Sequence, residues 1–164
     1  FFSDKIEKFI PAQKGKTHVL HIIRELLSFE PSSTGTDMAQ ALQYFSNAQK
    51  RHCTAFLITD FIGVEGLEKP LMISSNRHEV NAIQIYDRRE TELPNVGLVK
   101  FHDAETGQDL WVDTAVASVR EQYASEWKQN QSRIEQLCTK TGVKRMSVRT
   151  DEDYVKALMK LFKS

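Results

Sequence analysis

The fold class of this chain follows from one stretch of its sequence, CTAFLITD at residues 53–60. An uncharged, mostly apolar run from Cys53 to Thr59 ends abruptly in a carboxylate, Asp60. A run of this length is typical of a parallel strand whose two faces are covered by helices. We therefore expect residues 53–59 to form a central strand of an α/β sheet, with Asp60 at its carboxyl end.

Helical patterns precede this strand. Apolar residues recur at helical spacing from residue 17 to about residue 29, with Thr17 as the expected N-cap. Thr36 or Asp37 is expected to cap a second helix, whose buried face would consist of Met38, Ala41, Leu42, Phe45 and Ala48. Residues 1–10 hold two short apolar runs around a turn and begin without Met, so we expect them to be part of a hairpin in a longer chain.

The order of the elements after the strand predicts a parallel sheet. A weaker helix over residues 65–77 leads to a second apolar strand at residues 80–86, and this order implies right-handed crossovers. The pattern then predicts a charged connector (87–94), a β-hairpin (98–101 and 110–112) closed around 105–107, a long helix (116–139), a strand (143–149) and a last helix capped by Thr150.

Composition excludes several classes of protein. The 164 residues carry 22 basic and 22 acidic side chains, and this balance argues against a nucleic-acid binder, which usually has a basic surplus. Apolar runs are too short to span a membrane, and the amino terminus lacks a signal-peptide pattern. The two cysteines, Cys53 and Cys138, form no C-x-x-C pair and are predicted to be buried thiols, so we expect a cytoplasmic domain.

Asp60 is the strongest candidate for a functional residue. Ligands of open α/β sheets bind outside the carboxyl ends of the strands, and Gly35-Thr36-Asp37 would lie at the same edge as Asp60. Hydroxyl and carboxylate oxygens suit magnesium, calcium or manganese. The alternative is that Thr36 and Asp37 cap a helix and Asp60 caps the loop after its strand; the sequence leaves both interpretations open.

Two other groups of polar residues are weaker candidates for a functional site. His18 and His21 share one helical face but have no third metal ligand at a suitable spacing, and the other histidines are predicted to be solvated. The run from Asp87 to Glu92 alternates in sign and is expected to be a solvated, salt-bridged surface, or else the rim of the ligand crevice. The sequence has no nucleotide-binding glycine motif, serine-hydrolase elbow or zinc-protease motif.

Several stretches resemble a bacterial family of von Willebrand factor A-like proteins of unknown function. They are residues 2–11 and 18–27, Gly35-Thr36-Asp37, LITDF at 57–61, YDRRETELP at 86–94 and DAETG at 103–107. The resemblance implies a Rossmann-like, mostly parallel sheet flanked by helices with an added β-hairpin, in one domain over residues 1–164. It also implies action with MoxR-type AAA+ ATPases, beside which these proteins are often encoded, in the assembly or maturation of other proteins.

The same resemblance implies a metal-ion-dependent adhesion site. Thr36 and Asp60 match two of its positions, with Phe61 where many relatives have Gly, while the Asp-x-Ser-x-Ser motif is absent and would precede residue 1. Asp37 would lie nearby, and Arg88, Arg89 and Glu90 would lie at the rim or contact a partner. The first, central strand of such a sheet would also be missing, so we expect the chain to rearrange, to pair with a second copy or to be marginally stable.

Two classes of function remain. The first is a non-enzymatic module that binds a protein partner, with magnesium or another divalent cation held in the full-length protein. The alternative is a magnesium-dependent phosphoryl-transfer or hydrolytic domain in which Asp60 is the nucleophile or a metal ligand. We favour the binding module, because no Lys follows a later strand in the position that phosphoryl transfer would need.

Overall fold

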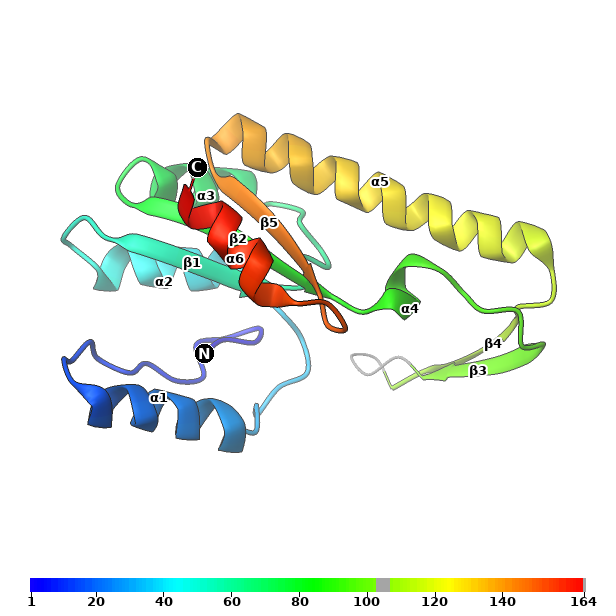
Figure 1. Cartoon of the computed structure of the whole chain (residues 1–164), viewed down its shortest axis with the longest axis horizontal. Coiled ribbons are helices and arrows are strands. Elements are labelled where there is room, and N and C mark those ends of the chain that lie inside the picture. Colours follow the sequence, from blue (N-terminus) through cyan, green and yellow to red (C-terminus); the bar gives the residue numbers. More distant parts are fainter. Residues whose placement is uncertain (103–106, 164) are drawn as a thin grey trace.

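The computed structural model describes residues 1–102 and 107–163; for Ala157 and residues 160–163 it describes the backbone alone. Its centre is a three-stranded parallel sheet in the order β1-β2-β5 (Figure 1). The strands are β1 (Thr54–Thr59), β2 (Glu79–Tyr86) and β5 (Lys144–Arg149). The register pairs Leu57 with Ala82 and Ala82 with Arg145. This confirms the predicted α/β class, but β1 lies at an edge of the described sheet rather than at its centre.

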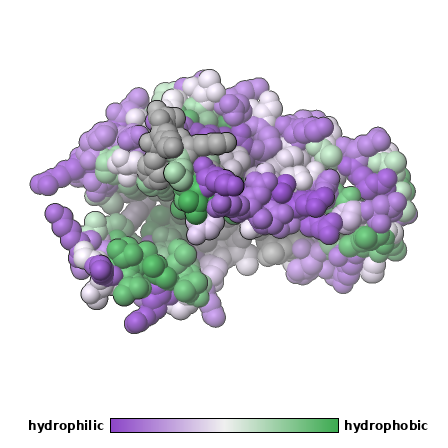
Figure 2. Space-filling model, in the orientation of Figure 1, coloured by the Kyte–Doolittle hydropathy of each residue, from purple (hydrophilic) through white to green (hydrophobic). Residues whose placement is uncertain are grey.

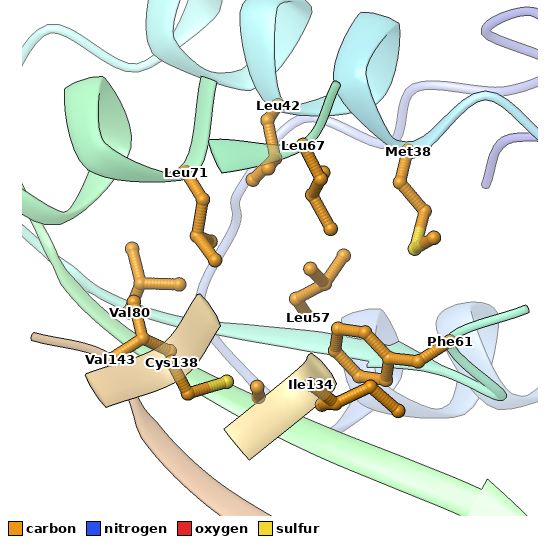
Figure 3. Packing of buried hydrophobic residues seen from close by; sticks show 11 residues of the cluster. Met38, Leu42, Leu57, Phe61, Leu67, Leu71, Val80, Ile134, Cys138 and Val143 are labelled. Carbon is orange, nitrogen blue, oxygen red and sulfur yellow. The ribbon is translucent and has the colours of Figure 1, made fainter. Parts of the chain in front are cut away.

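Three helices pack on one face of this sheet: α2 (Met38–Ala48), α3 (Glu68–Ser75) and α5 (Ala117–Thr141). The last helix, α6 (Tyr154–Lys163), lies beside β5 on the opposite face (Figure 1). The core lies between the sheet and helices α2, α3 and α5. It consists of Met38, Leu42, Leu57, Phe61, Leu67, Leu71, Val80, Ala82, Ile134, Cys138 and Val143 (Figure 3). Cys138 is buried as predicted, whereas Cys53 is only half-buried.

The hairpin prediction is confirmed on both of its strands. β3 (Leu98–His102) pairs with β4 (Asp109–Asp113) in antiparallel register, apart from the main sheet (Figure 1). Of the predicted closing residues, Glu105 and Thr106 lie outside the described residues. The connector before the hairpin contains a short helix that the charge pattern did not predict, α4 (Arg88–Thr91).

The first helix, α1 (Lys16–Ser28), forms as predicted, but its apolar stripe is not buried. No residue of α1 is buried, and Leu20, Leu26 and Leu27 are 63%, 65% and 81% exposed. In Figure 2 the side chains of this region form an apolar patch on the surface. The predicted hairpin of residues 1–10 is reduced to one antiparallel bridge between Phe2 and Ile6.

Two predicted caps are wrong. Helix α1 begins at Lys16 after Gly15, rather than at Thr17. Helix α6 begins at Tyr154, and the Asp153 carboxylate accepts a hydrogen bond from the Val155 amide, so Asp153 takes the capping role predicted for Thr150. Thr150 instead donates its hydroxyl hydrogen to the Asp87 carboxylate at 3.0 Å.

Candidate functional site

The carboxyl ends of the three parallel strands meet at one edge of the sheet. Asp60 follows β1, Asp87 follows β2 and Thr150 follows β5. The Thr150 amide donates to the Tyr86 carbonyl at 3.0 Å, and its hydroxyl reaches Asp87, so the last two strand ends are joined. In an open α/β sheet this is the edge where ligands bind, and we take it as the candidate site.

Asp60 lies in a tight turn directly after β1, and we call this turn the Asp60 corner. Its Oδ1 accepts a hydrogen bond from the Ile62 amide at 3.1 Å and one from the Thr59 hydroxyl at 3.3 Å, while the residue itself remains exposed. The next residue, Phe61, has φ of 60°, which side chains larger than glycine rarely adopt. Its ring is fully buried and lies near Leu57 and Ile134 (Figure 3). Burial of the ring therefore holds a strained backbone directly beside an exposed carboxylate.

A buried glutamine side chain holds the backbone of the Asp60 corner in place. Gln84 on β2 is fully buried, and its Nε2 donates to the Asp60 carbonyl at 3.2 Å. Its Oε1 accepts from Arg145 Nη2 at 2.6 Å and from the Ser147 hydroxyl at 3.1 Å. Arg145 also pairs with Glu135 on α5 at 3.1 Å. These hydrogen bonds fix the position of the corner relative to β5 and α5.

The roles of Gln84 and Arg145 are not predictable from the local sequence pattern. The only local signal is that Gln84 and Asn81 interrupt an otherwise apolar strand. A polar residue in a strand that is buried on both faces requires a partner, so this interruption points to a buried network. The sequence alone does not identify the partner, because Arg145 lies 61 positions away.

Thr36 and Asp37 lie where α2 begins. The Asp37 carboxylate accepts from the Gln40 amide at 2.8 Å and is the N-cap of the helix, and exposed Thr36 directly precedes it. The Asp37 amide donates to the Ser3 carbonyl at 2.8 Å, and this hydrogen bond links the start of α2 to the amino-terminal segment. Among the hydrogen bonds of the described residues, none joins Thr36 or Asp37 to Asp60.

These residues do not form a metal site by themselves. Within residues 1–102 and 107–163, no group of three or more His, Cys, Asp or Glu side chains is arranged to hold a metal ion. Thr36 and Asp60 would supply two oxygen ligands, and magnesium takes about six in octahedral geometry. A cation at this edge would therefore need further oxygen ligands from water or from another polypeptide segment.

Arg88, Arg89 and Glu90 lie at the same edge, in α4. The Asp87 carboxylate accepts from the Arg89 amide and Glu90 accepts from the Asp87 amide, both at 2.8 Å, which makes a capping box. The hydrogen bond from the Arg89 amide, followed by the one from the Thr150 hydroxyl, lowers the pKa of Asp87. Arg88 pairs with Glu92 at 2.9 Å. The charged run is thus an ordered, solvent-exposed rim, with the side chains of both arginines in water.

The histidines lie in different surroundings. His18 and His21 lie near each other on α1, with ring centroids 6.4 Å apart, and His21 lies 3.8 Å from Glu25. His78 was predicted to be solvated and is instead buried, with its Nδ1 3.7 Å from Cys53 Sγ and its ring against Phe45. Burial lowers the pKa of His78 from its usual 6.5.

Comparison with known proteins identifies the family. The profile of a family described as "Protein of unknown function DUF58" matches residues 1–133. The chain belongs to the DUF58 family. The match covers the amino-terminal segment, β1, β2, the hairpin and most of α5, and therefore includes Thr36, Asp60 and the whole α4 rim.

Uncharacterized mycobacterial proteins are similar to this DUF58 chain along most of its length. One from Mycobacterium avium is 28% identical over 94% of this chain and 92% of its own length. One from Mycobacterium bovis is 29% identical over 94% of this chain, which spans only 49% of that relative. Among solved structures, the conserved hypothetical protein BatB from Bacteroides thetaiotaomicron matches 88% of this chain and 70% of its own, with 16% identity and a TM-score of 0.44.

The described part of the chain contains no helix that is both long enough and apolar enough to cross a membrane.

Proposed function

We propose that this DUF58 chain is part of a non-enzymatic, von Willebrand factor A-like module that binds a protein partner at the carboxyl edge of its sheet. The observation that carries the proposal is the Asp60 corner. An exposed carboxylate sits beside a strained residue, Phe61, and Gln84 and Arg145 hold the backbone below it. Strain that buried contacts maintain next to an exposed acidic group is typical of binding sites.

The proposed site uses a divalent cation that the chain shares with other ligands. Asp60 and Thr36 supply hard oxygens suited to magnesium, and the remaining positions are filled by water, by further polypeptide of the full-length protein and by a carboxylate of the partner. The α4 rim, with Arg88, Arg89 and Glu90, flanks the partner. The charge balance of the chain supports a protein partner rather than a nucleic acid.

The partner we propose is an AAA+ ATPase of the MoxR type, with the module acting in the cytoplasm in the assembly or maturation of other proteins. This part of the proposal rests on the family resemblance of residues 57–61 and 86–94. Binding, not catalysis, is proposed because no Lys follows a later strand in the position that phosphoryl transfer would need.

The test measures binding of the chain to an immobilised MoxR-type ATPase, in magnesium and in EDTA. We expect the affinity to fall about tenfold or more in EDTA and in the Asp60→Asn variant. Glu121→Gln removes an exposed carboxylate on α5 and serves as the control with unchanged binding. Equal binding of the wild type in magnesium and EDTA together with full binding by Asp60→Asn would reject the metal-dependent site.

The alternative, phosphoryl transfer by Asp60, is tested on the same protein. Incubation with acetyl phosphate and magnesium would increase the mass of the wild type by one phosphoryl group, and Asp60→Asn would abolish this increase. We expect no increase in either protein, since the proposed module does no bond chemistry.

A further inference from the structure

At the amino edge of the sheet, a cysteine and a buried histidine lie side by side. The first register pair of β1 and β2 joins Thr54 with Glu79. The residues directly before them, Cys53 and His78, are therefore also neighbours. The Cys53 carbonyl accepts from the Glu79 amide at 3.0 Å, and the His78 amide donates to the Ser74 carbonyl at 2.9 Å. These backbone hydrogen bonds hold both residues in place, at the edge opposite the carboxyl ends of the strands.

The donor atoms of the two side chains face each other. His78 Nδ1 lies 3.7 Å from Cys53 Sγ. Zinc, a first-row d¹⁰ ion, lies about 2.3 Å from a cysteine sulfur and about 2.0 Å from an imidazole nitrogen. If an ion lay at these distances from both atoms, its two bonds would meet at an angle of about 120°, and neither side chain would have to move. This is the angle of a three-coordinate ion, in which one position remains for a ligand from solution.

The imidazole of His78 has no ordinary hydrogen-bond partner in the described part of the chain. The residue is 3% exposed, and its Nε2 is buried and makes no hydrogen bond. Its Nδ1 contacts only the thiol, which is a weak hydrogen-bond donor and acceptor. A buried polar group without a good partner costs free energy. A metal ion bound at Nδ1 would give this imidazole the strong bond that it lacks.

Of the two cysteines, only Cys53 is placed to receive an ion from solution. Cys53 is half-buried at the sheet edge, with exposed residues on both sides of it. Cys138 is 3% exposed and packs in the core beside Ile134 and Val143 (Figure 3). An ion can therefore reach the Cys53 sulfur while the protein stays folded.

The number and type of the ligands favour copper(I). Thiolate sulfur selects copper(I) and zinc, and imidazole suits both metals. Structural zinc sites are four-coordinate. Among the residues that the structure describes, no further His, Cys, Asp or Glu joins Cys53 and His78 in a group that could hold a metal ion. Copper(I) is stable with two or three ligands, so this pair suits copper(I) better than zinc.

The charges around the pair also favour a monovalent ion. Arg77 directly precedes His78, and Arg51 lies two residues before Cys53; both arginines are exposed. Copper(I) and one thiolate have no net charge together, whereas zinc and one thiolate carry a positive charge. Beside two arginines and against a buried imidazole, the neutral combination costs less free energy.

We propose that Cys53 Sγ and His78 Nδ1 form a binding site for a copper(I) ion. Binding releases the thiol proton to solvent and forms one Cu–S and one Cu–N bond, while the oxidation state of copper does not change. Because the ion joins the start of β1 to the start of β2, it stabilises the folded chain. The site lies at the opposite edge of the sheet from Asp60, so the proposal does not depend on the proposed function.

The first test measures competition for copper(I) between the full chain and the chromogenic chelator bicinchoninate, with ascorbate as reductant and without oxygen. We expect one copper ion per chain, and at least about tenfold weaker binding in Cys53→Ser and in His78→Asn. Cys138→Ala is the matched control with unchanged binding, because it removes the other thiol and leaves both ligands. A parallel titration with zinc is expected to give about tenfold weaker binding or less.

The second test needs no variant. Iodoacetamide is expected to alkylate Cys53 in the metal-free wild type, and to do so at least about tenfold more slowly after one equivalent of copper(I), because the sulfur is then bonded to the metal. Cys138 is expected to stay unmodified in both samples, since it is buried. Peptide mass spectrometry distinguishes the two cysteines.

Three results would overturn the proposal. Equal copper binding by the wild type and Cys53→Ser, with unchanged alkylation of Cys53, would place the metal elsewhere. One copper ion per two chains, with full binding by His78→Asn, would mean that the Cys53 thiolates of two chains bridge the ion. Zinc binding as tight as copper(I) binding would show that the pair does not select a monovalent ion.

Discussion

At the scale of single residues, Gln84 is the buried side chain that connects the Asp60 backbone to β5. Its side chain joins the Asp60 carbonyl, Arg145 and Ser147 inside the protein. Leucine has a similar size but offers no hydrogen bond, so Gln84→Leu would leave the Asp60 carbonyl and the Arg145 guanidinium without this partner. The cost of leaving buried polar groups without partners exceeds the gain from a more apolar side chain.

We expect Gln84→Leu to lower the free energy of unfolding by about 2–3 kcal/mol, measured by urea denaturation. Gln122→Leu is the matched control, because Gln122 lies exposed on α5 and bonds only to Glu126. A loss within about 0.5 kcal/mol for both variants would show that the network does not support the corner.

His78 makes stability depend on pH. Burial, followed by the charges of His52 and Arg77, lowers the pKa of His78 in the folded protein below its usual value of 6.5. The unfolded chain therefore binds this proton at higher pH than the folded protein does, and stability is lost as the pH falls below 6.5. Above that value both states carry a neutral imidazole, and His78 has no effect.

The measurement is urea denaturation at a series of pH values on either side of 6.5. We expect the wild type to lose stability toward the acidic side and the His78→Gln variant to lose less. Parallel pH profiles for the two proteins would assign the acid sensitivity to other groups.

At the scale of elements, α1 and α2 have similar apolar stripes but different surroundings. Leu42 of α2 is buried in the core, while Leu27 of α1 is 81% exposed. The amphipathic pattern predicted both helices correctly. The pattern did not show that, of these two helices, only α2 packs on the sheet. An apolar stripe indicates which face of a helix is apolar but not which element covers that face.

Single substitutions test this difference. Leu42→Ala is expected to cost about 2–5 kcal/mol of unfolding free energy through lost packing and the cavity left behind. Leu27→Ala is expected to change it by less than about 0.5 kcal/mol, as for other exposed sites. Chemical denaturation of both variants measures the difference; a comparable loss in Leu27→Ala would mean that α1 is covered in solution.

At the scale of the whole molecule, the parallel sheet has its core on one face and an open groove along one edge. Helices α2, α3 and α5 cover the core face of the sheet. The groove lies between β1 and the amino-terminal segment. The chain also has no net charge, so charge repulsion does little to keep copies apart. Self-pairing of the chain is therefore expected at this scale, and sedimentation velocity at several protein concentrations measures it.

The sequence by itself determined the strands β1 and β2, the helices α2 and α5, the hairpin and their order, because these depend on periodicity and on capping residues such as Asp37. It also placed Asp60 at a strand end. Only the tertiary structure decided that β1 lies at an edge of the described sheet, that no residue of α1 is buried, that His78 is buried and that Gln84 supports Asp60. Each of these depends on contacts between residues far apart in the chain, and local pattern carries no information about such contacts.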